Sequence, residues 1–457
     1  MTRGTNAMNG AYGMLTEGAR LTTERGDAIT VRHLLGSGGQ GEVYEVDTPA
    51  GTQALKWYFP QLADAQRWRI LETLVDRAWG DDRFLWPRTI VAEPSLTSFG
   101  YVMGLRPDHF HDLPALLRRD PAVSAATPRS LITTALNTVE AYLSLHSQGI
   151  AYRDISWGNV FFNPVNGDVL VCDNDNAVVE GESAGIAGTM NFMAPELVRG
   201  DPGAAPGIQT DLHSLAVLLF YLLMNHHPLD GAQELKIHCM DDKAQRKLYG
   251  VDPVFIYDPA ETRNRPVPGE QDTVIATWGA LPPVLRELFT RTFTEGLASP
   301  SRRVRETEWR DALSAVRDAI VPCHGCGKQN LAEPNGPAPR CWKCGRTVDL
   351  PLRLELTCGK SSRRTRRDIR LNEGAEVYAH HLVEDPERHD FAAAVGEVTA
   401  HPRTPGRLGL TNRSPVSWRV RRADGGEVEV PPGRTAALRP GVLLELGDGA
   451  EAVVRER

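Results

Sequence analysis

The residues best suited to do chemistry lie in one short stretch, 152–159, and at one position after it. The stretch reads Tyr-Arg-Asp-Ile-Ser-Trp-Gly-Asn, and Asp173 follows fourteen residues after Asn159. Phosphoryl transfer to a hydroxyl needs one group that orients the hydroxyl and others that hold the magnesium ions on the phosphates. Carboxylate and amide oxygens are the ligands that magnesium prefers. Asp154, Asn159 and Asp173 are therefore candidates for a base and two metal ligands.

Three glycines and a lysine precede this stretch. Gly36, Gly38 and Gly41 lie between two segments of alternating, often β-branched residues, which is typical of strands. A hairpin with glycines at its turn lets the backbone lie close to phosphates, because no Cβ is in the way. Lys56 lies in a further apolar strand, where a lysine is costly unless it is paired. We therefore expect Lys56 to reach both phosphates and an acidic partner.

Residues 63–78 carry apolar residues at helical spacing, and two acidic residues of this predicted helix could pair with Lys56. Glu72 is sixteen residues after Lys56 and is the partner that we expect, with Asp76 one turn later as the alternative. A solvated position on the helix surface is the other interpretation of Glu72. A second, amphipathic helix is predicted over 129–147 and leads the chain into the stretch described first.

In their order along the chain, these motifs resemble the eukaryotic-type serine/threonine protein kinases, of which bacteria also have members. The family's order and spacing are kept by the glycine-rich hairpin, Lys56, the 152–159 stretch, Asp173 and an Ala-Pro-Glu ending at Glu196. The resemblance implies an N-terminal extension over 1–28 and a bilobal protein kinase fold over 29–320. It also implies ATP and Mg2+ as cofactors and transfer of phosphate to serine or threonine hydroxyls of protein substrates.

The resemblance assigns roles to individual residues. Asp154 would be the catalytic base, and Lys56, paired with Glu72, would hold the phosphates. Asn159 and Asp173 would be the magnesium ligands. Met103 would be the gatekeeper, and backbone groups next to it would bind adenine. The positions that the family uses for nucleotide binding correspond here to Gly36, Gly38, Gly41, Val43, Ala54, Lys56, Met103 and Leu105.

Three further residues favour a protein over a small molecule as the substrate. By resemblance, Asp211 holds the backbone of the catalytic loop, and Arg303 pairs with Glu196 at the end of the activation segment. Small-molecule kinases such as the aminoglycoside phosphotransferases share the catalytic core but usually lack these features. Ser183, which lies in the same segment, is the candidate autophosphorylation site; an ordinary loop residue is its other interpretation.

The chain departs from the family at four positions. Tyr152 replaces the usual histidine, and Asn174 and Asp175 replace the phenylalanine and glycine after the magnesium aspartate. Ser156 stands where a lysine normally stabilises the transferring phosphoryl group. These changes leave a second hypothesis open, a pseudokinase adaptor that binds nucleotide and scaffolds partners. Together with a long segment over 231–285, they are similar to kinases of bacterial stress and tellurium-resistance gene clusters.

Four of the seven cysteines form two matching turns. The turns read Cys-His-Gly-Cys-Gly and Cys-Trp-Lys-Cys-Gly, with fourteen residues between the second and third of these cysteines. Each Cys-x-x-Cys turn directs two thiolates at one point, and four thiolates make a closed tetrahedral zinc site. The sequence therefore predicts a structural Zn2+ in a zinc ribbon over 321–350, with a redox dithiol as the alternative. The predicted ligands are Cys323, Cys326, Cys341 and Cys344.

The remainder of the chain, 351–457, is predicted to form an all-β sandwich. Short alternating segments lie at 353–356, 376–378, 407–410, 416–420, 427–430 and 442–446. The segment Leu-Gly-Leu-Thr-Asn-Arg-Ser, followed by a Pro-Pro-Gly turn, is similar to forkhead-associated domains, which bind phosphothreonine peptides. Their Ser-x-x-His segment does not occur in the sequence, so we name no phosphopeptide site. The resemblance implies that this domain and the zinc ribbon bind a protein partner or regulate the kinase.

Composition sets the outer limits of this interpretation. The chain has 457 residues, which favours more than one domain, and 41% hydrophobic and 24% charged residues are typical of a globular protein. Together with the resemblance, this implies a multidomain α+β protein. Residues 1–322 carry 29 Lys and Arg against 40 Asp and Glu, a net charge of −11, which argues against nucleic acid as a partner. The longest apolar run, 215–224, is too short to cross a bilayer, and no secretion signal is recognisable. We therefore expect no membrane partner and a cytoplasmic location.

Overall fold

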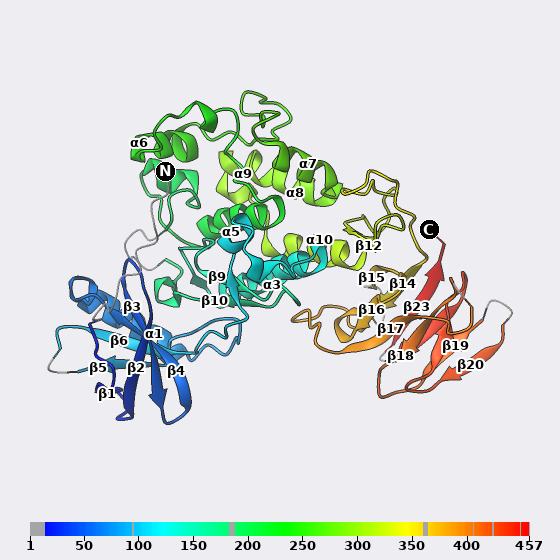
Figure 1. Cartoon of the computed structure of the whole chain (residues 1–457), viewed down its shortest axis with the longest axis horizontal. Helices are drawn as coiled ribbons and strands as arrows, with labels where there is room; N and C mark the ends of the chain where they lie inside the picture. The colour runs from blue at the N-terminus through cyan, green and yellow to red at the C-terminus, as the bar shows by residue number, and fades with distance from the viewer. Residues whose placement is uncertain are drawn as a thin grey trace.

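The computed structural model describes residues 14–456 apart from 94–95, 182–187, 360–363, 405, 423–424 and 448. Figure 1 shows a sheet at the lower left, a helical part in the centre and a second β part at the right. A short segment that contains four cysteines connects the helical part to the second β part. We call these the N-terminal sheet, the helical part, the cysteine segment and the C-terminal β part.

The N-terminal sheet is antiparallel, and its strands follow the order β1-β2-β3-β4-β6-β5. The strands are β1 (Arg20–Thr22), β2 (Ala28–Ser37), β3 (Gly41–Thr48), β4 (Gly51–Tyr58), β5 (Thr89–Ala92) and β6 (Phe99–Met103). In the register of β3 with β4, Lys56 lies opposite Val43. The sheet thereby places the lysine beside the end of the glycine-rich hairpin.

Helix α1 (Ala65–Arg77) packs on this sheet through one apolar face. Leu71 and Val75 of the helix share an apolar cluster with Ile90 and Phe99 of the sheet. The helix begins at a capping residue, because the Asp64 carboxylate accepts a hydrogen bond at 2.8 Å from the backbone NH three residues later. The helix predicted over 63–78 is therefore confirmed, one or two residues shorter at each end.

Two long helices, α3 and α5, form the centre of the helical part. Its helices are α2 (Pro114–Leu117), α3 (Pro128–Ser147), α4 (Pro195–Arg199), α5 (Ile208–Met224), α6 (Asp242–Gln245), α7 (Asp272–Ala280), α8 (Pro283–Thr292), α9 (Glu295–Ala298) and α10 (Glu306–Asp318). Thr127 and Ser130 exchange hydrogen bonds at the start of α3, where a proline occupies the first turn. The helix predicted over 129–147 is confirmed as α3.

Short strands in the helical part carry the loops of the candidate site. They are β7 (His111–Asp112), β8 (Ile150–Ala151), β9 (Val160–Phe162), β10 (Val169–Val171) and β11 (Val178–Val179). β9 pairs with β10 and with β7, and β8 pairs with β11. The β9–β10 pair is a local hairpin, whereas the other two pairs join segments that are distant in sequence.

The cysteine segment has a small core of its own. Strands β12 (Val321–Pro322) and β13 (Gln329–Asn330) pair at its start. Two of the cysteines, Cys323 and Cys341, are buried among a few apolar residues that include Val321 and Val348. A core of this size is too small to hold the segment by hydrophobic burial alone.

The C-terminal β part consists, within the described residues, of two antiparallel sheets that share one core. One sheet has the order β15-β14-β23-β22-β19-β20 and the other β16-β17-β18-β21. The strands are β14 (Arg353–Cys358), β15 (Thr365–Arg370), β16 (Glu376–Tyr378), β17 (Ala394–Ala400), β18 (Leu408–Asn412), β19 (Trp418–Arg421), β20 (Glu427–Val430), β21 (Thr435–Ala437), β22 (Leu443–Gly447) and β23 (Ala450–Arg455). The six predicted strand segments are confirmed as β14, β16, β18, β19, β20 and β22.

The C-terminal β part contacts the helical part through buried polar groups. Glu140 of α3 accepts hydrogen bonds from the His389 ring Nδ1 at 2.6 Å and from the His389 backbone NH at 3.2 Å. Arg317 of α10 lies with its guanidinium carbon 3.5 Å from the centre of the Phe391 ring. His381 Nε2 lies 3.2 Å from the carboxylate of Asp318 at the end of the same helix. In Figure 1 these contacts correspond to the junction beside α10.

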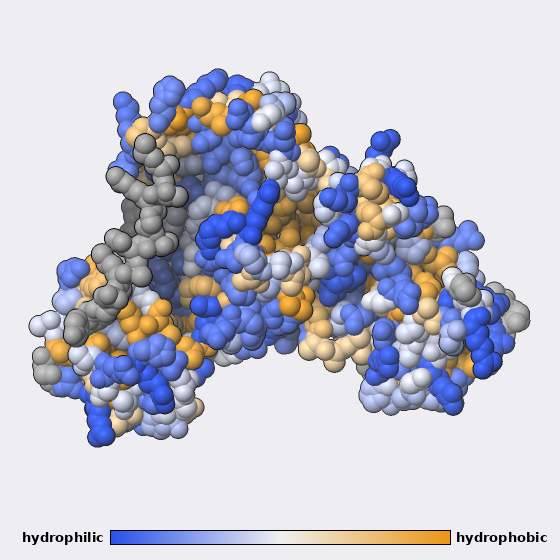
Figure 2. All heavy atoms as spheres, in the orientation of Figure 1, coloured by the Kyte–Doolittle hydropathy of each residue, from blue (hydrophilic) through white to orange (hydrophobic). Residues whose placement is uncertain are grey.

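Hydrophilic residues predominate on the face of the molecule shown in Figure 2, with smaller apolar patches between them. None of the helices in the described part of the chain combines the length and the apolar character that a membrane crossing needs.

The buried contact of Glu140 with His389 yields a prediction about stability. We expect Glu140→Gln to lower the free energy of unfolding by about 1–3 kcal/mol. The buried Arg83, which also pairs with Asp81 at 2.6 Å, loses the second of its two carboxylates, and His389 loses a charged hydrogen-bond acceptor. The measurement is urea denaturation of the full chain. Glu397→Gln is the matched control, because Glu397 pairs with Arg413 on the surface, where such pairs contribute less than about 1 kcal/mol. Equal effects of the two substitutions would contradict the prediction.

Candidate active site

The hairpin of β9 and β10 fixes the positions of the two predicted metal ligands. Val160 pairs with Val171 in its antiparallel register. Asn159 directly precedes β9, and Asp173 follows β10 by two residues, so both lie at the same end of the hairpin. The backbone NH of Cys172 donates to the carbonyl of Asn159 at 2.9 Å and closes this end. The structure thus brings together two side chains that are fourteen residues apart.

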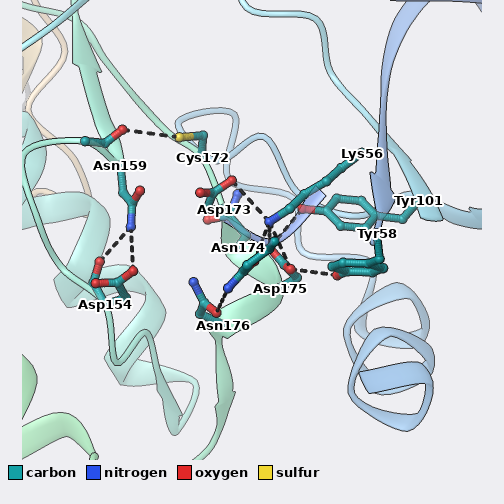
Figure 3. Close-up of polar contacts among 12 residues, drawn as sticks. Lys56, Tyr58, Tyr101, Asp154, Asn159, Cys172, Asp173, Asn174, Asp175 and Asn176 are labelled. Carbon is teal, nitrogen blue, oxygen red and sulfur yellow. Dashed lines mark hydrogen bonds and ion pairs between the residues drawn. The ribbon is translucent and has the colours of Figure 1, made fainter. Parts of the chain in front are cut away.

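Asp154, the candidate base, is held from two sides. The amide Nδ2 of Asn159 donates to the Asp154 carboxylate at 3.2 Å and to its backbone carbonyl at 2.9 Å. The backbone NH and the hydroxyl of Thr189 donate to the other carboxylate oxygen at 3.1 and 3.2 Å. Burial raises the pKa of Asp154, although these hydrogen bonds lower it in part. The side-chain oxygen of Asn159 points away from Asp154, to the side on which Asp173 lies (Figure 3).

A buried carboxylate on α5 holds the backbone of the loop that carries this base. Asp211 accepts hydrogen bonds from the NH of Tyr152 at 2.6 Å and from the NH of Arg153 at 2.9 Å. His146, at the end of α3, contacts Asp211 at 3.2 Å and Glu306 of α10 through its other ring nitrogen. Arg153 has a φ of +71°, a left-handed conformation that requires such support. The role predicted for Asp211 is confirmed.

Tyr152, predicted from the resemblance to replace a histidine, links this loop to the metal-ligand hairpin. Its hydroxyl donates to the carbonyl of Cys172, and its ring meets the ring of Tyr142 edge-on at 5.4 Å. The substitution therefore keeps a packing and hydrogen-bonding role in the described structure.

Lys56 lies at the centre of a buried ionic network (Figure 3). Its Nζ donates to the two carboxylate oxygens of Asp175 at 2.9 and 3.0 Å, to Asp173 at 3.3 Å and to the side-chain oxygen of Gln40 at 2.8 Å. The side chains of Lys56 and Asp175 are 5% and 0% exposed, whereas that of Asp173 is 41% exposed. Burial lowers the pKa of a lysine, but the charges of Asp175 and Asp173 outweigh this effect and raise the pKa of Lys56.

The prediction that Glu72 is the acidic partner of the lysine is wrong. Glu72 is exposed and accepts a hydrogen bond at 2.8 Å from the indole of Trp68, one turn earlier on α1. The face of α1 that packs on the sheet carries Leu71, and the next residue of a helix points about 100° away from it. Asp76, the alternative partner, is exposed as well. Asp175, which the sequence marked only as a departure from the family, takes the place next to the lysine.

Three more residues that the sequence analysis missed surround Asp175. The hydroxyls of Tyr58 and Tyr101 donate to its carboxylate at 2.6 and 3.0 Å. The guanidinium of Arg67, on α1, lies 3.4 Å from it and stacks over the ring of Tyr58. Two features of the sequence could have indicated this cluster. One is the helical pattern of α1, which carries Arg67, and the other is the second acid of the segment Asp-Asn-Asp over 173–175.

The glycines of the hairpin between β2 and β3 differ in their structural roles. A Cβ added to Gly41 would lie 2.1 Å from the carbonyl oxygen of Trp57, so this position admits only glycine. Gly36 and Gly38 border open space in the described structure. Gln40, beside Gly41, donates from its amide to the side chain of Asn176 at 3.2 Å and thereby joins the hairpin to the turn after Asp173.

The residues expected to contact adenine lie together in one apolar cluster. Ala54 and Met103 are buried in it, and Val43 and Leu105 border it. In the register of β4 with β6, Ala54 lies opposite Met103. The buried Leu170 of β10 closes the same cluster from the helical part.

The activation segment ends in the ion pair that the resemblance implied. The guanidinium of Arg303 donates to Glu196 at 2.7 Å and to the carbonyl of Gln209 at 2.7 Å, and its side chain is fully buried. The predicted pairing is confirmed. Ser183 lies outside the described residues.

The four cysteines lie close enough together to hold one metal ion. Their Sγ atoms lie within 4.8 Å of one another, with Cys323 to Cys344 at 3.7 Å and Cys326 to Cys341 at 3.5 Å. Gly327 and Gly345, the residues after the two turns, both have a φ of +71°, so the two turns repeat one conformation. Four soft sulfur ligands directed at one point suit Zn2+.

Much of the helical part is similar to known proteins. Residues 106–275 match the family described as the protein kinase domain. A probable serine/threonine-protein kinase of Corynebacterium efficiens is 28% identical over 130 residues, which are 27% of this chain and 19% of that protein. The serine/threonine-protein kinase PknB of Mycobacterium tuberculosis is 25% identical over 119 residues, 24% of this chain and 18% of that protein.

A third relative is eukaryotic: the serine/threonine-protein kinase PLK4 of Nematostella vectensis is 32% identical over 99 residues, 21% of this chain and 10% of that protein. The chain thus spans at most about a fifth of the length of these relatives. It carries a protein kinase domain, and the relatives of that domain named above are serine/threonine-protein kinases.

The position of His146 between two carboxylates yields a prediction about pH. Burial by itself would lower the pKa of His146, but its hydrogen bonds to Asp211 and Glu306 raise the pKa to about 9 from an ordinary 6.5. The stability that this charge contributes is therefore full below pH 6.5 and lost as the pH rises through 9. We expect the free energy of unfolding to fall over this range by on the order of 1–3 kcal/mol.

The measurement is urea denaturation of the wild type and of His146→Gln between pH 6 and about 9.5. The difference in stability between the two proteins should shrink as the pH rises, because the wild type loses the charge that the variant never has. A difference that stays constant with pH would contradict the assignment of a charged His146.

Proposed function

We propose that the chain is a magnesium- and ATP-dependent protein kinase that transfers phosphate to serine or threonine hydroxyls of protein substrates. The observation that carries the proposal is the convergence of Asp154, Asn159, Asp173 and Lys56 at one end of the β9–β10 hairpin. The first three of these residues lie in the segment that matches the protein kinase domain. The N-terminal sheet and the helical part would be the two lobes of this kinase, over residues 29–320.

The residues at the site fit magnesium. Asp173 is half-buried, with 41% of its side chain exposed, and Asn159 has its amide nitrogen turned to Asp154, which leaves its oxygen for a cation. Oxygen donors of this kind are those that Mg2+ prefers. Magnesium bound there would neutralise the charge of the phosphates.

The chain's own groups would position the acceptor and the nucleotide. Asp154, held by Thr189 and Asn159, would accept the proton of the substrate hydroxyl and orient its oxygen. Lys56 would bind phosphate oxygens, and the apolar cluster around Ala54 and Met103 would enclose adenine. The pair of Glu196 and Arg303 supports a protein as the acceptor, because it holds the segment against which a peptide would lie.

A second candidate is a pseudokinase adaptor that binds nucleotide without efficient transfer. The observation in its favour is the buried Ser156, at the position where related kinases place a lysine that stabilises the moving phosphoryl group. The complete set of Lys56, Asp154, Asn159 and Asp173 favours the enzyme.

We further propose that the cysteine segment, over 321–350, is a zinc ribbon and that the C-terminal β part, over 351–457, serves partner binding or regulation. The cluster of four sulfurs and the small core of the segment support the first. Two sheets with a common core support a forkhead-associated-like architecture for the second. A bacterial kinase of stress and tellurium-resistance clusters is the finer placement that the sequence suggests.

The kinase proposal is tested by transfer of labelled γ-phosphate from ATP to the chain itself and to casein. We expect Asp154→Ala to lower the rate on the order of 10²- to 10⁴-fold, since it removes the base, and Asp173→Ala to abolish transfer. Asp168→Ala is the matched control, because Asp168 is an exposed carboxylate at the opposite end of the same hairpin. Equal labelling of protein by the wild type and all variants would contradict the kinase proposal. Nucleotide binding without phosphate transfer would favour the adaptor.

The zinc proposal is tested by metal analysis and limited proteolysis of the full chain. We expect one equivalent of zinc in the wild type and its loss in Cys341→Ser, because a closed site made of four thiolates needs all of them. Removal of the metal should expose residues 321–350 to proteases, since metal supplies the folding free energy of so small a unit. Cys239→Ser, at an exposed lone cysteine, is the control. A segment that stays protease-resistant after chelation would contradict the proposal.

A further inference from the structure

A lysine in a kinase site needs an acidic partner that keeps its ammonium group aimed at the phosphates, and related kinases take this partner from the helix beside the sheet. In the described structure that helix is α1, and its buried face presents Leu71 and Val75 to the sheet. Its acidic residues Glu72 and Asp76 lie on the exposed side. Helix α1 therefore offers a cation, Arg67, but no acid to this site.

Asp175 has the properties that the missing partner requires. Both of its carboxylate oxygens accept hydrogen bonds from Lys56, and its side chain is completely buried. The hydroxyls of Tyr58 and Tyr101 fix the carboxylate from the side of the sheet. A buried carboxylate with so many donors has one orientation, and a group with one orientation can hold its partner in place.

The other two partners of Lys56 are of a different kind. Asp173 is 41% exposed and contributes one contact of 3.3 Å. Gln40 lies at the tip of the glycine-rich hairpin, in the segment that must lie over the phosphates. We expect a bound nucleotide to engage Asp173 through the metal and the hairpin of Gln40 through the phosphates, which leaves the completely buried Asp175 to hold Lys56.

We propose that Asp175 is the positioning residue that aligns Lys56 with the nucleotide phosphates, in place of a glutamate from helix α1. The inference rests on the proposed kinase function. Asp175 lies in the turn η3 (Asn174–Asn176), which begins directly after the magnesium ligand Asp173. One short segment would therefore position both the lysine and the metal, and a displacement of α1 would not separate Asp175 from Lys56.

The test compares Asp175→Asn with Glu72→Gln in phosphate transfer to casein at varied ATP concentration. We expect Asp175→Asn to lower kcat/KM for ATP on the order of 100-fold, mainly through a higher KM for ATP, because the neutral amide no longer holds the charge of Lys56. Glu72→Gln and Asp76→Asn should leave both constants within about twofold of the wild type. A smaller folded fraction alone would lower kcat and leave the KM for ATP unchanged, so the KM separates positioning from folding.

A milder variant tests the inference should Asp175→Asn not fold. Tyr58→Phe combined with Tyr101→Phe removes two hydroxyls from Asp175 without any change of charge. We expect the KM for ATP to rise roughly 3- to 10-fold, because Asp175 loses part of its support. An unchanged KM for ATP in this variant, or a loss of activity in Glu72→Gln, would overturn the inference.

Nucleotide binding separates this inference from the proposed function. Calorimetric titration of the chain with ATP in the presence of magnesium measures the affinity for the nucleotide without any phosphate transfer. This affinity depends on whether Lys56 is held in place to bind the phosphates. If the wild type binds ATP but transfers no phosphate, the kinase proposal fails, and a weaker affinity in Asp175→Asn still supports the role of Asp175. Equal affinities in wild type and Asp175→Asn overturn that role whether or not phosphate is transferred.

Discussion

The buried carboxylate of Asp211 is the interaction on which the geometry of the site depends. A charge in the core of the helical part is stable only if donors surround it, and two of its donors are successive backbone NH groups of the loop before Asp154. The loop must therefore adopt the backbone conformation that presents both NH groups to one carboxylate, with Arg153 in the left-handed region. Asp154, the candidate base, is the next residue in the chain, so these two hydrogen bonds to Asp211 determine its position.

From Asp211 a continuous series of hydrogen bonds crosses to the N-terminal sheet. Arg153 donates from its Nε to the carbonyl of Asn176 at 2.7 Å, and the side chain of Asn176 accepts from Gln40. Gln40 in turn accepts from Lys56. The turn at 174–176 is thus held on one side by the loop of the base and on the other by the hairpin. This explains why an acid on that turn can serve the lysine: its position is already determined on both sides.

The parts of this site that could be predicted from sequence are those that depend on local spacing. Asn159 and Asp173 flank a hairpin, and a hairpin brings its ends together whatever surrounds it. The partner of Lys56 depends instead on which face of α1 meets the sheet, and the spacing of the motifs does not indicate that face. The helical periodicity of the apolar residues does indicate it: if Leu71 is buried, its neighbour Glu72 must point away from the sheet. Similarly, the six predicted strands at the C-terminus are real, but the order in which strands pair within the two sheets depends on contacts between distant residues, which alternation alone does not specify.

The same two helices support the catalytic loop and the C-terminal β part. Helix α3 carries Glu140, which binds His389 of the β part, and six residues later His146, which binds Asp211. Helix α10 begins with Glu306, the other partner of His146, and ends near Arg317, which stacks on Phe391. Because the two helices pack along each other, the β part is attached to the elements that orient the base and not to a peripheral surface of the kinase domain. We therefore expect a loss of packing at this junction to reach the loop of Asp154 through these two helices.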